Sequence, residues 1–205
     1  PQKIDSMKAF VGYNKIRIEN GAVVKDDPRV QINTSAIAKG YSCDIVADVL
    51  QSFGITNYMV EIGGEITMRG VNEKGDCWRI GIDKPTDDAL AMNRELQLIL
   101  SVCDKAVATS GNYRNYYVKD GVKYSHTIDP QTGYPSEQDI LGATIIADDC
   151  MTADAYATAF MAMGLEKSVE VAKTISGLHY YFIYAKPDGE VDVLFSDEFQ
   201  QFMVN

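Results

Sequence analysis

The sequence predicts an α+β fold in which antiparallel sheets pack against a few helices. Short apolar stretches separated by turn residues occupy most of the chain, as is typical of strands, and two longer segments have helical spacing. Runs of strands punctuated by a few helices are typical of the α+β class. With 205 residues, 46% of them hydrophobic, the chain can bury one sizeable core, so we predict a single domain over residues 1–205.

The strand predictions follow the turn residues. Residues 15–18 and 22–25 flank Asn20-Gly21, a pair that tolerates the positive φ angles of a tight turn, so a hairpin is expected to open the domain. Residues 29–32 are strand-like, and the middle of the chain is expected to form an antiparallel meander. Further strands are predicted on both sides of an Asp120-Gly121 turn and in a terminal hairpin. The remaining predicted strands are 58–62, 66–69, 78–82, 96–102, 105–110, 116–118, 123–125, 143–147, 179–185 and 190–195.

Two segments predict the main helices. The first begins near Ala38, where Tyr41, Ile45 and Val49 recur with a helical period, and it stops near Gly54. The second, residues 152–163, contains five alanines and neither glycine nor proline, and Gly164 follows where a left-handed cap is expected. A further helix over 165–175 and a short terminal helix complete the prediction.

Composition excludes several classes of function. The net charge of −10 and the pI near 4.6 argue against nucleic-acid binding, which needs clusters of Lys and Arg. No apolar run approaches the ~18 residues of a membrane span. A polyphosphate ligand would therefore need a local positive charge. The chain begins at Pro1 without a targeting signal, so we expect a piece of a longer precursor.

The four cysteines, at positions 43, 77, 103 and 150, lie far apart and form no Cys-x-x-Cys pair. The spacing suggests neither a zinc site nor a dithiol redox motif. We expect buried free thiols, because cysteine is among the residues most often buried.

Asp154 and Thr158 stand four residues apart on the alanine-rich helix, so they share one face about a turn apart. A carboxylate and a hydroxyl are hard oxygen ligands of the kind that Mg²⁺ prefers. The alternative is that Asp154 complements the positive end of the helix dipole and Thr158 is an ordinary buried hydroxyl.

The segment from Asn33 to Tyr41 joins the predicted strand at 29–32 to the first helix, and such turns direct backbone amides at anions. Its small residues would let a diphosphate approach, and Lys39 would add positive charge. The alternative is a plain helix cap at Ser35.

Two further segments end strands in small residues. Gly63-Gly64 lie between Glu61 and Glu65, where the backbone can approach a flat ligand closely, although paired glycines also mark a bulge or a turn. The segment 109–113, Thr-Ser-Gly-Asn-Tyr, is by itself a loop.

The sharpest segment runs from Ser125 to Pro135 and contains His126, one of two histidines in the chain. A histidine on a loop rich in Pro and Gly can act as a general base near neutral pH. The other histidine, His179, lies in an aromatic strand and is expected to be structural.

Taken together, the segments 36–41, 61–65, 109–113, 126–133 and 152–159 closely resemble the ApbE-like FAD:protein FMN transferases in order and spacing over nearly the whole chain. The resemblance implies an ApbE-like architecture related to the T-fold, here without its N-terminal part.

The same resemblance implies the ligands. It implies Mg²⁺ held by the main-chain oxygen of Ala36, the carboxylate of Asp154 and the hydroxyl of Thr158. It also implies contacts to FAD at or near Asn33, Lys39 and Ile128. Asp154 and His126 are then the catalytic candidates, with His126 as the base.

The implied reaction is attack by a threonine hydroxyl of an acceptor flavoprotein, a subunit of a membrane redox complex, on the FMN-side phosphorus of FAD. AMP leaves, and Mg²⁺ and Lys39 neutralise the diphosphate. The short acceptor motif of the family is absent here, so the chain resembles the modifier. Two alternatives are hydrolysis of FAD to FMN and AMP, and flavin binding without catalysis. Family members are usually exported, often as lipoproteins, so we expect a periplasmic, lipid-anchored protein.

Overall fold

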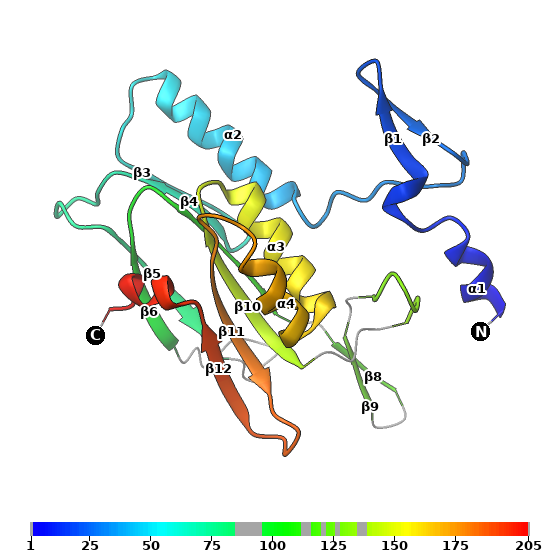
Figure 1. Cartoon of the computed structure of the whole chain (residues 1–205). Coiled ribbons are helices and arrows are strands. Elements are labelled where there is room, and N and C mark those ends of the chain that lie inside the picture. Colours follow the sequence, from blue (N-terminus) through cyan, green and yellow to red (C-terminus); the bar gives the residue numbers. More distant parts are fainter. Residues whose placement is uncertain are drawn as a thin grey trace.

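The computed structural model describes residues 2–84, 96–111, 116–119, 122–125, 128–134 and 139–204. Helices cover one face of a large antiparallel sheet, and a small second sheet lies on the other face (Figure 1). The predicted α+β class is therefore confirmed. Within the described ranges, no helix combines the length and the apolarity needed to cross a bilayer.

The large sheet has six strands in the order β12-β11-β10-β7-β4-β3, and every neighbouring pair is antiparallel. Its centre is β10, whose residues are almost all buried, as expected for a strand covered on both faces. The strands are β3 (Tyr58–Ile62), β4 (Glu65–Arg69), β7 (Ala106–Gly111), β10 (Ile140–Ala147), β11 (His179–Ala185) and β12 (Val191–Phe195).

Three helices cover one face of this sheet: α2 (Ala38–Ser52), α3 (Cys150–Met163) and α4 (Leu165–Ala172). The core between α3 and the sheet combines small and large side chains, with Ala153 and Ala157 next to Phe160 and Phe182. The alanines let the helix approach the sheet closely, while the two phenylalanine rings fill the remaining space edge to face. Gly164 has a positive φ of 79°, as predicted, but its ψ of 169° is extended, so α4 follows at once.

The opposite face is covered by a hairpin of β5 (Trp78–Asp83) and β6 (Leu96–Val102) and by the 3₁₀ helix η2 (Asp197–Phe202). A second apolar core lies between them and the sheet, and it includes Leu100, Val107, Ile146 and Phe199. The predicted meander is therefore wrong in one respect. The strands are antiparallel, but β5 and β6 leave the main sheet, and β4 pairs with β7 instead.

The prediction of four free thiols is also wrong. Cys77 and Cys103 form a disulfide immediately before β5 and after β6, with Cα atoms 4.9 Å apart. This bond closes the open end of the hairpin. Cys43 and Cys150 are free and buried, as predicted, and burial raises the pKa of both thiols.

An N-terminal arm, residues 2–37, lies beside the body of the protein and leads into α2 (Figure 1). It contains α1 (Gln2–Lys8), the 3₁₀ helix η1 (Tyr13–Lys15) and the hairpin of β1 (Ile16–Glu19) and β2 (Ala22–Lys25). The predicted hairpin is confirmed, with φ of 52° at Asn20 and 77° at Gly21, although α1 precedes it. The predicted strand at 29–32 is absent from the described structure, where these residues form a turn and irregular backbone.

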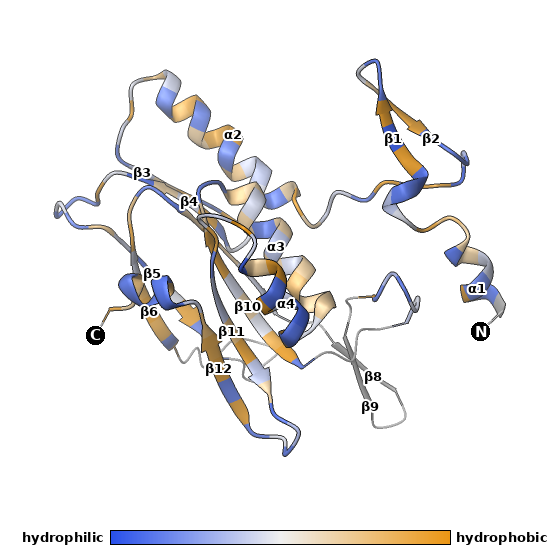
Figure 2. Cartoon of the chain, viewed as in Figure 1, coloured by the Kyte–Doolittle hydropathy of each residue, from blue (hydrophilic) through white to orange (hydrophobic). Residues whose placement is uncertain are grey.

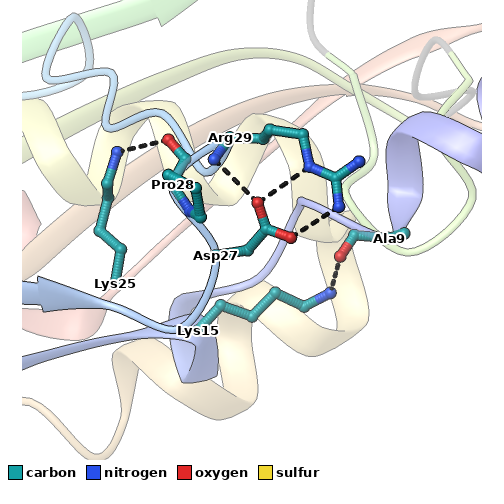
Figure 3. A network of polar contacts seen from close by, with 6 residues as sticks. All are labelled: Ala9, Lys15, Lys25, Asp27, Pro28 and Arg29. Carbon is teal, nitrogen blue, oxygen red and sulfur yellow. Dashed lines mark hydrogen bonds and ion pairs between the residues drawn. The ribbon is translucent and has the colours of Figure 1, made fainter.

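Polar contacts hold the turn after β2 (Figure 3). The guanidinium of Arg29 donates to both carboxylate oxygens of Asp27, at 2.9 and 2.7 Å, and it lies 3.9 Å from the centre of the Phe10 ring. This pairing lowers the pKa of Asp27 to about 2. Lys25 donates to the carbonyls of Pro28 and Val30 at 2.9 and 2.7 Å. Charge, rather than a core, therefore organises this part of the arm, although three of the four residues of β2 and two of the four residues of β1 are hydrophobic (Figure 2).

The remaining hairpin, β8 (Tyr116–Lys119) with β9 (Val122–Ser125), confirms the predicted pair of strands. The predicted turn at Asp120-Gly121 lies outside the described residues. The single-domain assignment stays a prediction.

Candidate functional site

The helices α2 and α3 run antiparallel past each other, and each gives the other a carboxylate. Asp154 of α3 accepts a hydrogen bond from the Gly40 amide in the first turn of α2, at 3.0 Å. Asp44 of α2 accepts from the first amides of α3, those of Cys150 and Met151, at 2.9 and 2.8 Å. The first amides of a helix lack partners within it and carry partial positive charge, so both carboxylates stabilise helix ends. This exchange fixes the position of Asp154 relative to α2.

Gly40 makes the close approach of the two helices possible. A Cβ atom at this position would lie 2.3 Å from the Cys150 carbonyl oxygen and 2.8 Å from the Asp154 Cβ. No side chain fits there without moving α2 away from α3. Asp154 is consequently only 2% exposed, although it carries a carboxylate.

Lys39 brings the paired-glycine segment to the same place. Its ammonium lies 2.6 Å from Glu65 Oε2 and donates to the Gly63 carbonyl oxygen at 3.4 Å. Glu65 is 2% exposed, whereas the Lys39 side chain is 47% exposed. Burial raises the pKa of the Glu65 carboxyl, the ion pair with Lys39 opposes the rise, and the charge of Asp154 adds to it. The Glu65 carboxyl is therefore within electrostatic range of Asp154.

Thr158 lies one turn beyond Asp154 on α3, as predicted, and its hydroxyl is 3.3 Å from that of Ser110 near the end of β7. Ser110 comes from the segment 109–113, of which residues 112 and 113 lie outside the described structure. The end of β7 and the helix α3 are thus joined by a hydroxyl pair one helical turn beyond Asp154.

Asn33 and Ala36 precede α2. The Asn33 side chain is exposed, and its Oδ1 accepts from the Ser35 amide at 2.9 Å, which forms a turn. The alternative of a helix cap at Ser35 is not found, because α2 begins at Ala38 and Ile37 is its N-cap. Ala36 is half-buried and lies before that cap, so its carbonyl oxygen lies outside the hydrogen-bond ladder of the helix.

Ile128 is placed apart from these groups. It is 51% exposed and lies beside a turn over residues 129–134, in which the Gly133 amide donates to the Asp129 carbonyl oxygen at 2.8 Å. Gly133 faces Ile4 and Lys8 of α1. Within the described chain, no hydrogen bond or ion pair joins this turn to Lys39 or Asp154. His126, the predicted base, lies outside the described residues.

Three of the five segments therefore meet at the first turn of α2, and the described part of a fourth, residues 109–111, contacts α3 one turn beyond Asp154. Comparison with known proteins explains their order: residues 1–182 match the ApbE family. The chain belongs to the ApbE family. A curated relative, the FAD:protein FMN transferase of Vibrio cholerae, is 46% identical over 172 residues, which are 84% of this chain and 50% of the relative. The Escherichia coli K12 protein of the same name is 36% identical over 208 residues, or 100% of this chain and 58% of the relative.

Solved structures of ApbE proteins agree with this assignment. The flavin transferase ApbE from Vibrio cholerae superimposes with a TM-score of 0.85 at 41% identity, over 98% of this chain and 62% of that one. The ApbE protein from Thermotoga maritima gives a TM-score of 0.83 at 30% identity, over 100% and 64% of the two chains. The chain thus spans about half to two thirds of the length of these relatives.

The chemistry of the oxygen donors fits a hard cation. Asp154 offers a buried carboxylate, Thr158 a hydroxyl, and Ala36 a carbonyl oxygen outside the helix ladder. Mg²⁺ takes such oxygen ligands and completes its shell with water or phosphate. The described residues contain no group of three or more His, Cys, Asp or Glu side chains arranged to hold a metal. A cation held by a single carboxylate and two neutral oxygens would keep coordination positions for water or phosphate.

A cavity of about 360 Å³ lies along the later turns of α2, where Asp44, Ala47 and Gln51 line it, and contains none of the predicted site residues. Its polar lining includes Arg69 and a group of aspartates, among them Asp48, Asp104 and Asp148. A lining with this excess of negative charge repels a diphosphate. The predicted residues at the first turn of α2, and not this cavity, form the candidate site.

Sequence reasoning missed two functional features of this site. Gly40 belongs to the segment 36–41 that carried the family resemblance, but its close contact with α3 was not predicted. Glu65 was recognised only as a neighbour of the paired glycines, whereas the structure buries it against Lys39. A charged residue directly after two glycines, at the start of a strand with buried neighbours, was the available signal.

Proposed function

We propose that this chain is part of a Mg²⁺-dependent enzyme that transfers FMN from FAD to a threonine hydroxyl of an acceptor flavoprotein and releases AMP. The relatives bear the name FAD:protein FMN transferase. The observation that carries the proposal is the position of Lys39 and Asp154 at the first turn of α2, with Thr158 one turn beyond Asp154 on α3. A cation site beside a lysine and a helix N-terminus suits a diphosphate.

In the proposed reaction the threonine Oγ forms a bond to the FMN-side phosphorus, and the bond from that phosphorus to the bridging oxygen breaks. The bridging oxygen leaves with AMP, and the threonine proton passes to His126, the proposed base. Mg²⁺ held by Ala36, Asp154 and Thr158 would neutralise phosphate charge and orient the diphosphate.

The residues of the chain itself have separable tasks. Lys39, whose side chain is 47% exposed, places its ammonium beside Gly63 and Glu65, where it would bind a phosphate oxygen. Asp154 is held in one orientation by the Gly40 amide, so its remaining lone pairs keep a fixed direction. Asn33 and Ile128 are proposed to contact other parts of FAD.

The decisive test uses Asp154→Asn with Asp44→Asn as a matched control. Both substitutions replace a carboxylate that accepts a hydrogen bond from a helix N-terminus by a neutral amide, but only Asp154 belongs to the proposed site. The chain is incubated with FAD, Mg²⁺ and an acceptor domain that carries the family's threonine motif. Flavin fluorescence of the acceptor in a gel and released AMP are measured together. We expect Asp154→Asn to lose more than about 100-fold in transfer, while folded Asp44→Asn retains most of it.

The outcomes separate the candidate functions. AMP without a labelled acceptor would identify a hydrolase, and tight FAD binding indifferent to Mg²⁺ would identify a binding module. Equal activity of the two variants would remove Asp154 from the catalytic site.

We also propose that the protein is exported, lipid-anchored on the periplasmic side, and acts on a flavoprotein subunit of a membrane redox complex. The Cys77–Cys103 disulfide supports an oxidising compartment, because such bonds rarely persist in the cytosol. Thiol titration of protein recovered from periplasmic and cytosolic fractions tests the location. Cytosolic protein with four reduced cysteines would contradict it.

A further inference from the structure

Glu65 is a buried carboxylate that the proposed reaction does not use. It begins β4 directly after Gly63-Gly64 and is 2% exposed. Its Oε2 lies 2.6 Å from the Lys39 ammonium, yet that oxygen accepts no hydrogen bond of ordinary geometry. The contact is therefore an ion pair held by charge. A buried carboxylate is unfavourable without a partner, so its presence here requires an explanation.

Lys39 is held by Gly63 in the turn before β4 and by Glu65, the first residue of β4. Glu65 attracts its ammonium, and the Gly63 carbonyl oxygen accepts from it at 3.4 Å. A Cβ atom at Gly63 would lie 3.1 Å from the Lys39 Cδ, so the lysine stem lies along bare backbone. Gly63 also has φ of 62°, a conformation that glycine adopts most readily. Gly63 thus leaves room for the lysine stem, and the turn places the buried carboxylate beside its ammonium.

The strand side of this arrangement is fixed as well. The Cys43 thiol of α2 donates to the Glu65 carbonyl oxygen at 3.2 Å, which ties the backbone of β4 to the helix that carries Lys39. A free lysine has many rotamers and loses that freedom when it binds a ligand. A lysine already held in place loses less, so its ligand binds more tightly.

We propose that Glu65 is a positioning residue for the diphosphate of FAD, because it holds the Lys39 ammonium at the first turn of α2. The inference rests on the proposed function. A positioning role of Glu65 differs from a purely structural role in a way that can be tested. If Glu65 acts through Lys39, removal of its charge matters to FAD only while Lys39 is present.

A double-mutant cycle measures this dependence. The chain, Glu65→Gln, Lys39→Met and the double variant are compared for FAD affinity in Mg²⁺ by quenching of flavin fluorescence, and for AMP release at saturating FAD. We expect Glu65→Gln to weaken FAD binding about tenfold and to change the saturated rate less than about threefold. The double variant should bind FAD as weakly as Lys39→Met alone. Equal effects of Glu65→Gln in both backgrounds, or no effect, would overturn the inference.

A second measurement needs no FAD. Lysines are ¹³C-methylated, and the Lys39 signal is assigned by its loss in Lys39→Met. A held amine gives two resolved methyl signals in the parent chain, and we expect them to merge in Glu65→Gln and to stay resolved in Glu65→Asp, which keeps the charge. This measurement tests whether Glu65 holds the Lys39 ammonium whether or not the chain binds FAD, so failure of the inference can be told apart from failure of the proposed function. A Lys39 signal that is unchanged in folded Glu65→Gln refutes it.

Discussion

Replacement of Gly40 by alanine tests the closest contact in the site. Helix propensity alone favours alanine by about 1 kcal/mol. The new methyl group, however, would lie 2.3 Å from the Cys150 carbonyl oxygen, so α2 and α3 must separate by about 1 Å. That movement breaks the 3.0 Å hydrogen bond from the Gly40 amide to Asp154.

The magnitude follows from these opposing effects. Overpacking costs about 1–3 kcal/mol, and the loss of a hydrogen bond to a buried charged group costs about 1.5–3 kcal/mol. After the propensity gain, Gly40→Ala should lower the free energy of unfolding by about 1.5–5 kcal/mol. For a chain of this length that corresponds to a fall in Tm of about 10 °C near the middle of the range.

Thermal and urea unfolding followed by circular dichroism measure this change. Ser42→Ala is the matched control, because Ser42 is exposed on the same helix. It should stay within about 0.5 kcal/mol of the parent chain. If Gly40→Ala instead raised Tm by a few degrees, propensity would dominate, and the backbone contact between the helices would not exist as described.

Three further predictions concern other parts of the fold. Burial lowers the pKa of His179, whose Nδ1 has no hydrogen-bond partner. The neutral imidazole therefore contributes stability that is fully present above pH 6.5 and is lost as pH falls toward the lowered pKa. His179→Gln should therefore lose less stability than the parent chain between pH 7 and pH 5 in urea titrations, and parallel curves would contradict this. Reduction of the Cys77–Cys103 disulfide, which spans 26 residues, should lower the free energy of unfolding by about 3.5 kcal/mol. An unchanged urea midpoint after reduction would show that the bond is not formed. Ile45→Lys should change the unfolding free energy by less than about 0.5 kcal/mol because Ile45 is 44% exposed, whereas Ala47→Lys, at a site 5% exposed, should unfold the chain. Similar melting curves for the two variants would contradict the assigned face of α2.

The extent of α2 was predictable from sequence, but its buried face was not. Tyr41, Ile45 and Val49 revealed the helical period, yet they are 52%, 44% and 49% exposed. The residues that α2 buries are small: Gly40, Cys43 and Ala47. Periodicity analysis gives weight to large apolar side chains, whereas a close contact between two helices selects small ones.

Contacts between residues far apart in the sequence limited how much of the remaining fold and site could be predicted. Local patterns located the strands of the β5–β6 hairpin, but their departure from the main sheet depends on the pairing of β4 with β7. The spacing of Asp154 and Thr158 was visible because it lies within one helix. The partner of Asp154, Gly40, stands 114 residues away, and the two cysteines of the disulfide also lack a local signal. Such contacts are set by the fold and not by neighbours in the sequence.

The N-terminal arm has a consequence for how the site would respond to ligands. Of the described residues before Gly40, Val30 alone is buried, and the stretch that follows it contains the exposed Asn33 and the half-buried Ala36. Asp154, in contrast, belongs to the core. Local opening of residues 33–37 therefore exposes little apolar surface, and their amides should exchange with solvent long before those of α3. A ligand that contacts both residues 33–37 and Asp154 would hold that stretch against the core. Slowed hydrogen exchange at residues 33–37 should therefore be the most sensitive sign of bound ligand.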